Sequence, residues 1–230
     1  MPARRTLIAS LVSLALLAGC GDDDDGATDT TTTTEAATST TAVRLEQPAV
    51  WPAADVVFET PEEAASDFVS QVLGVPPTLG GFQQGDNRSG EIELLSPGEG
   101  GGARVVRSVL LLRQLGPDDG WFVLAAIGDP TSISAPEAGD DVPAGPTTVR
   151  GQGRGFEGSL VVSALRAGEP EPLDDAVTQG GAMADPLPFE VTLDLSDARP
   201  GDTVVLLVRG GTGLETDPGE LSAIPVTIAG

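Results

Sequence analysis

The sequence has no histidine, no lysine and no tyrosine, and all twelve of its basic residues are arginine. The absence of histidine excludes Ser-His-Asp and Cys-His catalytic arrangements, as well as His-ligated zinc sites. The absence of lysine excludes Ser-Lys dyads, Schiff-base enzymes and lysine-dependent phosphate-binding loops. Paired carboxylates still permit glycoside hydrolysis, but such sites normally hold sugar rings on aromatic platforms, and only 3% of the residues are aromatic. The sequence therefore predicts that the protein is not an enzyme.

Cysteine is almost absent as well, and one sign of charge dominates. A single cysteine in 230 residues allows no internal disulfide, so stability must come from apolar packing, for which 40% hydrophobic residues are sufficient. This length is typical of one or two domains. The 35 acidic residues give a net charge of −23. Because a polyanion repels phosphate backbones, no nucleic-acid partner is expected.

The first twenty residues have the pattern of an export signal. Arg4 and Arg5 form a charged start, and residues 6–16 form an apolar segment that is too short to span a bilayer. The paired arginines loosely resemble a twin-arginine signal, but an ordinary basic start is the simpler interpretation. Residues 1–20 are therefore predicted to be a signal peptide that follows the general secretory route.

The end of this segment resembles the lipobox of bacterial lipoproteins. Leu17, Ala18 and Gly19 precede Cys20. The resemblance implies that the Cys20 sulfur receives diacylglycerol, with acyl chains such as palmitate, and that cleavage makes Cys20 the new N-terminus. Two acyl chains anchor a protein stably. The protein is therefore expected to be anchored through this lipid to the outer face of the cytoplasmic membrane. The alternative is an ordinary secretory signal peptide that happens to end near a cysteine.

Residues 21–46 are predicted to be a disordered tether. Four aspartates at positions 22–25 are followed by a threonine-rich tract from Thr28 to Thr41 that has almost no large apolar side chain. Such a segment cannot bury enough surface to offset the entropy of ordering it. The aspartates are interpreted as a solvated spacer, since a disordered carboxylate run binds ions only diffusely. Whether the threonines carry O-glycans stays open.

Residues 47–130 are predicted to form a small α+β domain. Thr60, Pro61 and Glu63 form a helix start with a capping box. Apolar residues at helical spacing follow, and a glycine and two prolines end the helix. Strand patterns come next, with a hairpin loop at 116–120 between the last two; these patterns span Glu91–Leu95, Arg104–Leu115 and Trp121–Ile127. The helix is expected to cover one face of an antiparallel sheet.

Residues 131–230 are predicted to form a β-sandwich, which makes the fold mainly β. A segment rich in proline and glycine marks the boundary, and no helical period follows it. The apolar positions from Phe189 to Leu195 alternate with polar ones, which indicates a sheet with one wet face. The expected strands lie near Thr147–Arg150, Ser159–Leu165, Phe189–Leu195, Thr203–Arg209 and Ser222–Ile228.

The sequence of this second part resembles the GerM-associated immunoglobulin-like domain of bacterial spore germination. The resemblance covers roughly residues 131–230 and is clearest at Phe156, Glu157 and Gly158; other matching segments are 149–151, 159–162, 188–191 and 224–226. It implies an immunoglobulin-like sandwich in an exported bacterial protein, with no established catalytic residues. Phe156 is expected to fill the sandwich core, and Gly158 to permit a close backbone approach.

This chain also departs from the pattern of that family. The segment Gly210–Glu215 replaces a Ser-Ala-Asp-Gly-like stretch after the penultimate strand, so a binding role carried by that loop in relatives does not transfer. The lysine-free composition, rich in arginine, alanine and glycine, is typical of a high-GC bacterium such as an actinobacterium. Such an organism need not form endospores.

Two further motifs have features of binding sites. Residues Gly153–Gly158 match G-x-G-x-x-G and Asp174 lies about twenty residues on, but a strand is expected after the motif where dinucleotide binding needs a helix. Three aspartates around a turn, Asp194, Asp197 and Asp202, offer carboxylate oxygens that could bind calcium. Because their spacing is not that of an EF-hand, they are interpreted as solvated turn residues. Neither a cofactor nor a metal ion is therefore expected.

Together these patterns predict a lipid-anchored cell-envelope protein that acts as a non-catalytic recognition or scaffolding module, in sporulation, germination or cell-wall processes. Its partner would be another envelope protein or a cell-wall component. The alternative is a lipoprotein that binds a solute or cell-wall glycan between the two domains, near Trp51 or Trp121. Trp121 opens an apolar strand, which favours a place in the core.

Overall fold

The computed structural model describes residues 45–97, 104–182 and 185–230. Its one α-helix, α1, spans Pro61–Gln71. The Thr60 side chain accepts a hydrogen bond from the Glu63 amide, and the Glu63 carboxylate accepts one from the Thr60 amide, so the predicted capping box is present. Ala64, Ala65, Phe68 and Val69 are fully buried. The helix therefore begins where its cap residues predict and packs through one apolar face.

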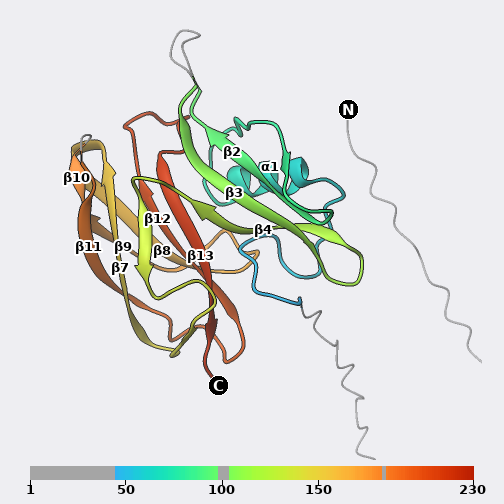
Figure 1. The fold of residues 1–230 in the computed structure, drawn as a ribbon. Coiled ribbons are helices and arrows are strands. Elements are labelled where there is room, and N and C mark those ends of the chain that lie inside the picture. Colours follow the sequence, from blue (N-terminus) through green and yellow to red (C-terminus); the bar gives the residue numbers. More distant parts are fainter. Residues whose placement is uncertain (1–44, 98–103, 183–184) are drawn as a thin grey trace, which may run out of the picture. The chain divides into compact units, whose positions relative to one another are not determined.

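A nine-stranded sheet forms the centre of the fold (Figure 1). Its main path runs in the order β1-β2-β3-β4-β13-β12-β8-β9, and the short strand β6 pairs with β13. Neighbouring strands on the main path are antiparallel. The strands are β1 (Gln83–Gln84), β2 (Ser89–Leu95), β3 (Val106–Leu115), β4 (Gly120–Ile127), β6 (Asp141–Val142), β8 (Ser159–Arg166), β9 (Pro172–Gln179), β12 (Thr203–Gly210) and β13 (Glu220–Ile228).

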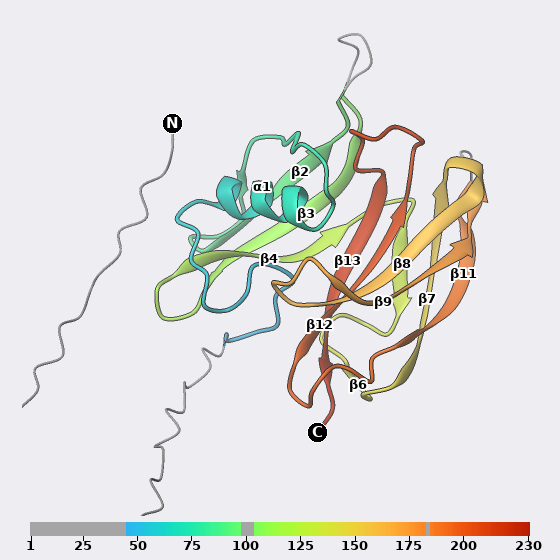
Figure 2. The same ribbon diagram turned by 180° about the vertical axis from the view of Figure 1, so that it is seen from behind.

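A second sheet of four strands completes the sandwich. Its long antiparallel pair, β7 and β11, is flanked by β5 and by the two-residue strand β10, which runs parallel to β7. The strands are β5 (Ser132–Ala135), β7 (Pro146–Gly155), β10 (Gly181–Ala182) and β11 (Leu187–Asp194). Figures 1 and 2 show this sheet against β8, β9 and β12, and α1 over β2, β3 and β4.

The central sheet buries a separate core on each face. Alternate residues of β12 divide between the two: Val204, Leu206 and Val208 contribute to the core shared with the second sheet, while Val205 and Leu207 contribute to the core beneath α1. A strand that is buried on both faces has a continuous apolar sequence, as the VVLLV run of β12 does. The α1 layer and the sandwich thus use the same strands.

The two parts of the chain on either side of the predicted boundary at residue 130 are joined by paired strands of one sheet. β4 lies before it and β13 after it, and the two strands pair at Ala126 and Ala223. The Ser222 hydroxyl also donates to the Ala126 carbonyl oxygen. The described residues form one compact unit. That residues 47–130 and 131–230 are separate domains stays a prediction.

The strand predictions hold for the long strands and miss the short or polar ones. β2, β3, β4, β8, β11, β12 and β13 begin and end within about two residues of their expected bounds, and β7 extends five residues further, to Gly155. β9 was missed because its sequence, PLDDAVTQ, carries two adjacent aspartates and little alternation. Aspartate is depleted in strands in general, but charge is common on sheet edges, where β9 lies.

The described chain begins inside the segment that the sequence assigns to the tether. Leu45 packs beside the small cluster of Ala49, Leu115 and Phe122, and the Glu46 carboxylate accepts a hydrogen bond from the Gly116 amide at 2.8 Å. This bond lowers the pKa of Glu46. The signal peptide, the lipobox with Cys20 and residues 21–44 lie outside the described residues. Within the described part of the chain, no helix has the length and apolarity needed to cross a membrane.

Candidate functional site

The Phe156–Gly158 motif forms a single 3₁₀ turn between β7 and β8. Glu157 has φ 55° and Gly158 has φ +76°, so both lie in the left-handed region. Gly158 is suited to this conformation, and a Cβ there would lie 3.1 Å from the Gly180 carbonyl oxygen. The close backbone approach expected at Gly158 is therefore present. Glu157 has no such freedom, so its conformation is strained.

Phe156 does not lie in the sandwich core, which corrects the expectation from the sequence. Its side chain is 48% exposed. The Phe156 amide donates to the Gly211 carbonyl oxygen at 2.7 Å, and the ring lies close to Gly213, where a Cβ would be 3.4 Å from it. The core position is instead taken by Phe189 of β11, which is 5% exposed. The turn points Phe156 outward because its backbone is held by the loop after β12.

That loop, residues 211–219, joins β12 to β13 and includes most of the segment in which the chain departs from its resemblance. Its start is packed against β7: a Cβ at Gly210 would lie 1.8 Å from the Arg154 carbonyl oxygen, so only glycine fits there. In the sequence, nothing connects the motif at 156–158 with the loop 211–219. The structure brings them into contact at one end of the sandwich.

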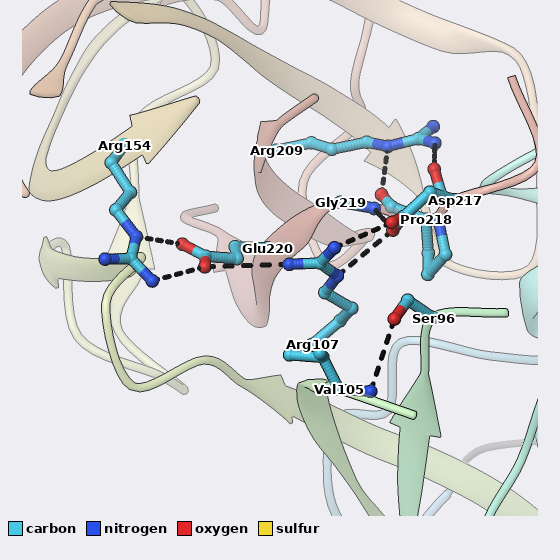
Figure 3. A network of polar contacts seen from close by, with 9 residues as sticks. All are labelled: Ser96, Val105, Arg107, Arg154, Arg209, Asp217, Pro218, Gly219 and Glu220. Carbon is cyan, nitrogen blue, oxygen red and sulfur yellow. Dashed lines mark hydrogen bonds and ion pairs between the residues drawn. The ribbon is translucent and has the colours of Figure 1, made fainter. Parts of the chain in front are cut away.

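A buried ionic network lies beneath this loop (Figure 3). Arg107 of β3 donates to both carboxylate oxygens of Asp217, from Nε at 3.1 Å and from Nη2 at 2.7 Å. The Asp217 side chain is only 3% exposed and that of Arg107 is 17% exposed. Asp217 Oδ1 also accepts a hydrogen bond from the Gly219 amide at 2.9 Å. A two-point Arg–carboxylate pair with a further amide donor fixes the loop in one orientation.

Glu220, the first residue of β13, extends the network to β7. Arg154 donates to Glu220 Oε2 from Nε at 2.8 Å and to Oε1 from Nη2 at 2.7 Å. The Arg107 Nη1 atom lies 3.9 Å from Glu220 Oε1. The hydrogen bonds that Arg154 donates to the Glu220 carboxylate raise the pKa of Arg154. The network therefore links two strands of the central sheet, β3 and β13, with β7 of the second sheet.

Arg209 of β12 supports the same loop through backbone carbonyl groups. Its Nε donates to the Pro218 carbonyl oxygen at 2.5 Å, and its Nη1 donates to the Leu73 carbonyl oxygen at 2.9 Å, beyond the end of α1. Burial lowers the pKa of Arg209. The loop is thus held by Arg107 of β3 and by Arg209 of β12, and Arg209 connects it to the segment after the helix.

Little in the sequence indicates this network. Arg107 interrupts an apolar run of β3, and Asp217-Pro218-Gly219 is a turn signal, but residues 110 positions apart carry no local evidence of pairing. An arginine among alternating valines and leucines is equally consistent with a solvent-exposed strand face. Only the pairing of the strands brings Arg107 to Asp217.

A groove of about 760 Å³ lies beside the network. It is lined by Val105, Val106, Ile127 and Pro130 from the first part of the chain, and by Arg154 and Pro186 from the second. Val106 and Ile127 are about half exposed. An apolar groove with a few fixed charges between two layers has the general character of a ligand site.

Neither tryptophan lines this groove. A second groove, of about 610 Å³, lies next to Trp51 in the chain: Ala49 and Pro52 line it together with Arg166 and Thr203 of the second part. An interdomain site near the tryptophans therefore stays a prediction. Trp51 is 5% exposed and donates from Nε1 to the Asp67 carboxylate at 2.8 Å. Trp121 packs edge-to-face on Phe82, with ring centroids 5.3 Å apart. Both side chains serve the packing of the α1 layer.

The residues of the G-x-G-x-x-G motif and of the three-aspartate turn have structural roles. The strand β8 follows Gly153–Gly158, as expected, and the Asp174 carboxylate accepts a hydrogen bond from the Asp194 amide. Asp194 and Asp202 each accept a backbone amide in their turn, from Ser196 and Arg199. Asp197 contributes its carbonyl oxygen to Arg166. In the described part of the chain no group of acidic, histidine or cysteine side chains is arranged to hold a metal ion.

Comparison with known proteins agrees with this geometry. Searches of curated proteins and of solved structures found no match to the chain. A scan of protein-family models matched residues 131–209 to Gmad2, the immunoglobulin-like domain of bacterial spore germination. The match covers β5 to all but the last residue of β12 and includes the Phe156–Gly158 turn. Together with the two-sheet sandwich it confirms the predicted fold class: this protein is mainly β, and its C-terminal part is an immunoglobulin-like domain whose residues 131–209 are similar to Gmad2.

Proposed function

We propose that the protein is a lipid-anchored recognition or scaffolding module of the bacterial cell envelope, with a role in germination-related or cell-wall processes. The observation that carries this proposal is the Gmad2 match over the sandwich. Immunoglobulin-like sandwiches present loops from a rigid frame, and the function of such a fold resides in those loops. The buried network holds the loop 211–219, and Phe156 is exposed beside this loop. Residue types needed for common catalytic sites are absent from the whole sequence.

The recognition role itself has a direct biochemical test. Purified protein is expected to leave cell-wall glycan and peptide intact, because it lacks histidine and lysine and because the carboxylates of the network, such as Asp217, are engaged in ion pairs. Release of soluble fragments from purified peptidoglycan, measured by chromatography and lost on substitution of one carboxylate, would identify an enzyme instead.

The lipid anchor is tested at Cys20. Native protein is expected to have the mass of a chain that starts at Cys20 and carries a diacylglycerol thioether, and to partition into the detergent phase. Cys20→Ala removes the sulfur that accepts the lipid, so this variant is expected in the aqueous phase. Gly19→Ala keeps a small residue before Cys20 and is the matched control, with processing unchanged. An uncleaved leader or a free thiol in native material would contradict the anchor.

The groove beside Arg154 favours a second candidate function, the binding of a solute or cell-wall fragment between the two layers. Its walls come from both parts of the chain, and its volume of about 760 Å³ is in the range of small-molecule sites. The described aromatic side chains do not line it, so a ligand would be held by aliphatic contact and by charge, which suits a muropeptide's peptide stem better than its sugars.

Binding in the groove can be measured by calorimetry with purified muropeptides. Val106→Asp places a charge on the apolar wall, and we expect it to weaken binding by at least about tenfold, since an apolar ligand surface would have to desolvate the carboxylate. Val177→Asp changes a valine that is 67% exposed on β9, outside the groove, and is expected to have no effect. Equal affinities for both variants would exclude the groove as the binding site.

A further inference from the structure

Two large apolar side chains are exposed together at the end of the sandwich. Phe156 and Leu214 are each 48% exposed. They belong to neighbouring loops, because the Phe156 ring lies against Gly213, the residue before Leu214. Isolated exposed apolar residues are ordinary on protein surfaces, but a group of them on a fixed frame is typical of a contact surface. We refer to Phe156, Glu157, Leu214 and Glu215 as the Phe156 surface.

The backbone beneath Phe156 holds it outward at a cost. Among described residues other than glycine, only Asp119 and Glu157 have positive φ values. Asp119 lies in a hairpin loop, where aspartate tolerates this conformation well, whereas a glutamate gains no comparable local hydrogen bond. Strained residues of this kind persist where the surroundings determine them, often at ligand-binding positions. Here the strained turn carries an exposed aromatic ring.

The charge around this surface is acidic. Glu157 and Glu215 are both exposed beside the apolar pair. The arginines closest in the fold interact with acidic groups or carbonyl oxygens within the network: Arg107 with Asp217, Arg154 with Glu220, and Arg209 with Pro218. A partner that covers Phe156 therefore has to match carboxylates at the rim of the contact with positive charge.

The same charge excludes several other occupants. A second copy of this chain would bring two molecules of net charge −23 together at surfaces that both carry glutamates. Nucleic acids and anionic lipid head groups are repelled for the same reason. A basic protein segment with an apolar side chain satisfies both the hydrophobic centre and the acidic rim.

We propose that the Phe156 surface docks a basic segment of another envelope protein, with Phe156 as the central apolar contact and Glu157 and Glu215 as charge partners at the rim. This inference rests on the proposed recognition function and assigns it to one surface. Central aromatic residues contribute most to such contacts, while charges at the rim mainly set the association rate and its salt dependence.

The test is site-specific photo-crosslinking in cells that make the full-length protein. The crosslinking amino acid p-benzoylphenylalanine is placed at Phe156 and, as a matched exposed control, at Val177 of β9. Mass spectrometry then identifies the crosslinked peptide. We expect the adduct formed at position 156 to contain a segment with net positive charge and at least one large apolar side chain, and no such adduct at position 177.

The crosslinked segment is then made as a synthetic peptide and titrated against the purified protein. Phe156→Ala is expected to weaken peptide binding by at least about tenfold. The double variant Glu157→Arg with Glu215→Arg is expected to weaken binding and to reverse its salt dependence. Val177→Ala is expected to leave binding unchanged. Circular dichroism melting checks that each variant is folded.

Three outcomes would overturn the inference. The first is that no adduct forms at position 156. The second is an adduct whose partner is an acidic segment, a glycan or a second copy of this chain. The third is that the folded Phe156→Ala variant binds the peptide with unchanged affinity. A protein adduct formed only at position 177 would reject the Phe156 surface while leaving the recognition function in place. Peptidoglycan hydrolysis by the purified protein would instead reject the recognition function.

Discussion

A fragment of residues 131–230 is expected to be unfolded or aggregated when it is made alone, although it contains the whole immunoglobulin-like sandwich. The reason is the second face of the central sheet, whose side chains pack against α1 and the segments around it. The large side chains that the fragment would expose are Leu165, Val205, Leu207 and Leu221. At about 1.5–3 kcal/mol for each, their exposure costs about 6–12 kcal/mol, which is comparable to the entire stability of a domain, about 5–15 kcal/mol.

The experiment compares this fragment with residues 45–230 by circular dichroism and by thermal unfolding. The longer chain is expected to unfold in one cooperative transition, because both cores share β12 and β13. Phe68→Ala in α1 provides an independent test within the longer chain. Loss of this fully buried ring should cost about 3–5 kcal/mol and lower hydrogen-exchange protection in β12 as well as in β2. A stable fragment, or loss of protection confined to residues 47–130, would show that residues 131–230 are an independent domain.

Asp217→Ala is expected to lower the free energy of unfolding by about 3–5 kcal/mol, the usual consequence of removing one partner of a buried ion pair. The substitution leaves Arg107 without its two-point acceptor and removes the acceptor of the Gly219 amide. Asp217 is 3% exposed, so water cannot readily replace these contacts. For a folded unit of this size the melting temperature should fall by roughly 10 °C, as measured by scanning calorimetry.

An exposed ion pair supplies the control for this prediction. Arg150 and Glu190 form a pair between β7 and β11, with side chains 56% and 63% exposed. Glu190→Ala is expected to cost less than about 1 kcal/mol. In a double-mutant cycle, Arg107→Ala should cost much less in the Asp217→Ala background than in the native chain. Similar losses for Glu190→Ala and Asp217→Ala, or strict additivity in the cycle, would contradict the importance of the buried network.

The parts of the fold that the sequence predicted are those encoded by local patterns. The capping box of α1 depends on residues three apart, and the hairpin loop at 116–120 depends on five consecutive residues. The strands with apolar alternation or a long apolar run were also found, because burial of one or both faces of a sheet determines those patterns. β9 was missed because an edge strand rich in polar residues needs neither pattern.

The candidate site was only partly predictable. The sequence singled out Phe156–Gly158 as a motif through its resemblance to a family, and Gly158 makes the close backbone contact that was predicted for it. The outward direction of Phe156 was not predicted, since an aromatic residue beside a strand is more often buried. Its direction depends on a hydrogen bond to Gly211, 55 positions away, which no local pattern reveals.

By itself, the sequence determined the chemical limits of this protein and most of its regular structure. Missing residue types exclude whole classes of active site, and periodicity assigns strands and a helix, because both depend on composition or on near neighbours. Tertiary structure alone decided that one sheet serves two cores, that Arg107 meets Asp217, and that Phe156 faces solvent. These features depend on the pairing of strands far apart in the chain, and the side chains that meet there carry no mark of their partners before folding brings them together.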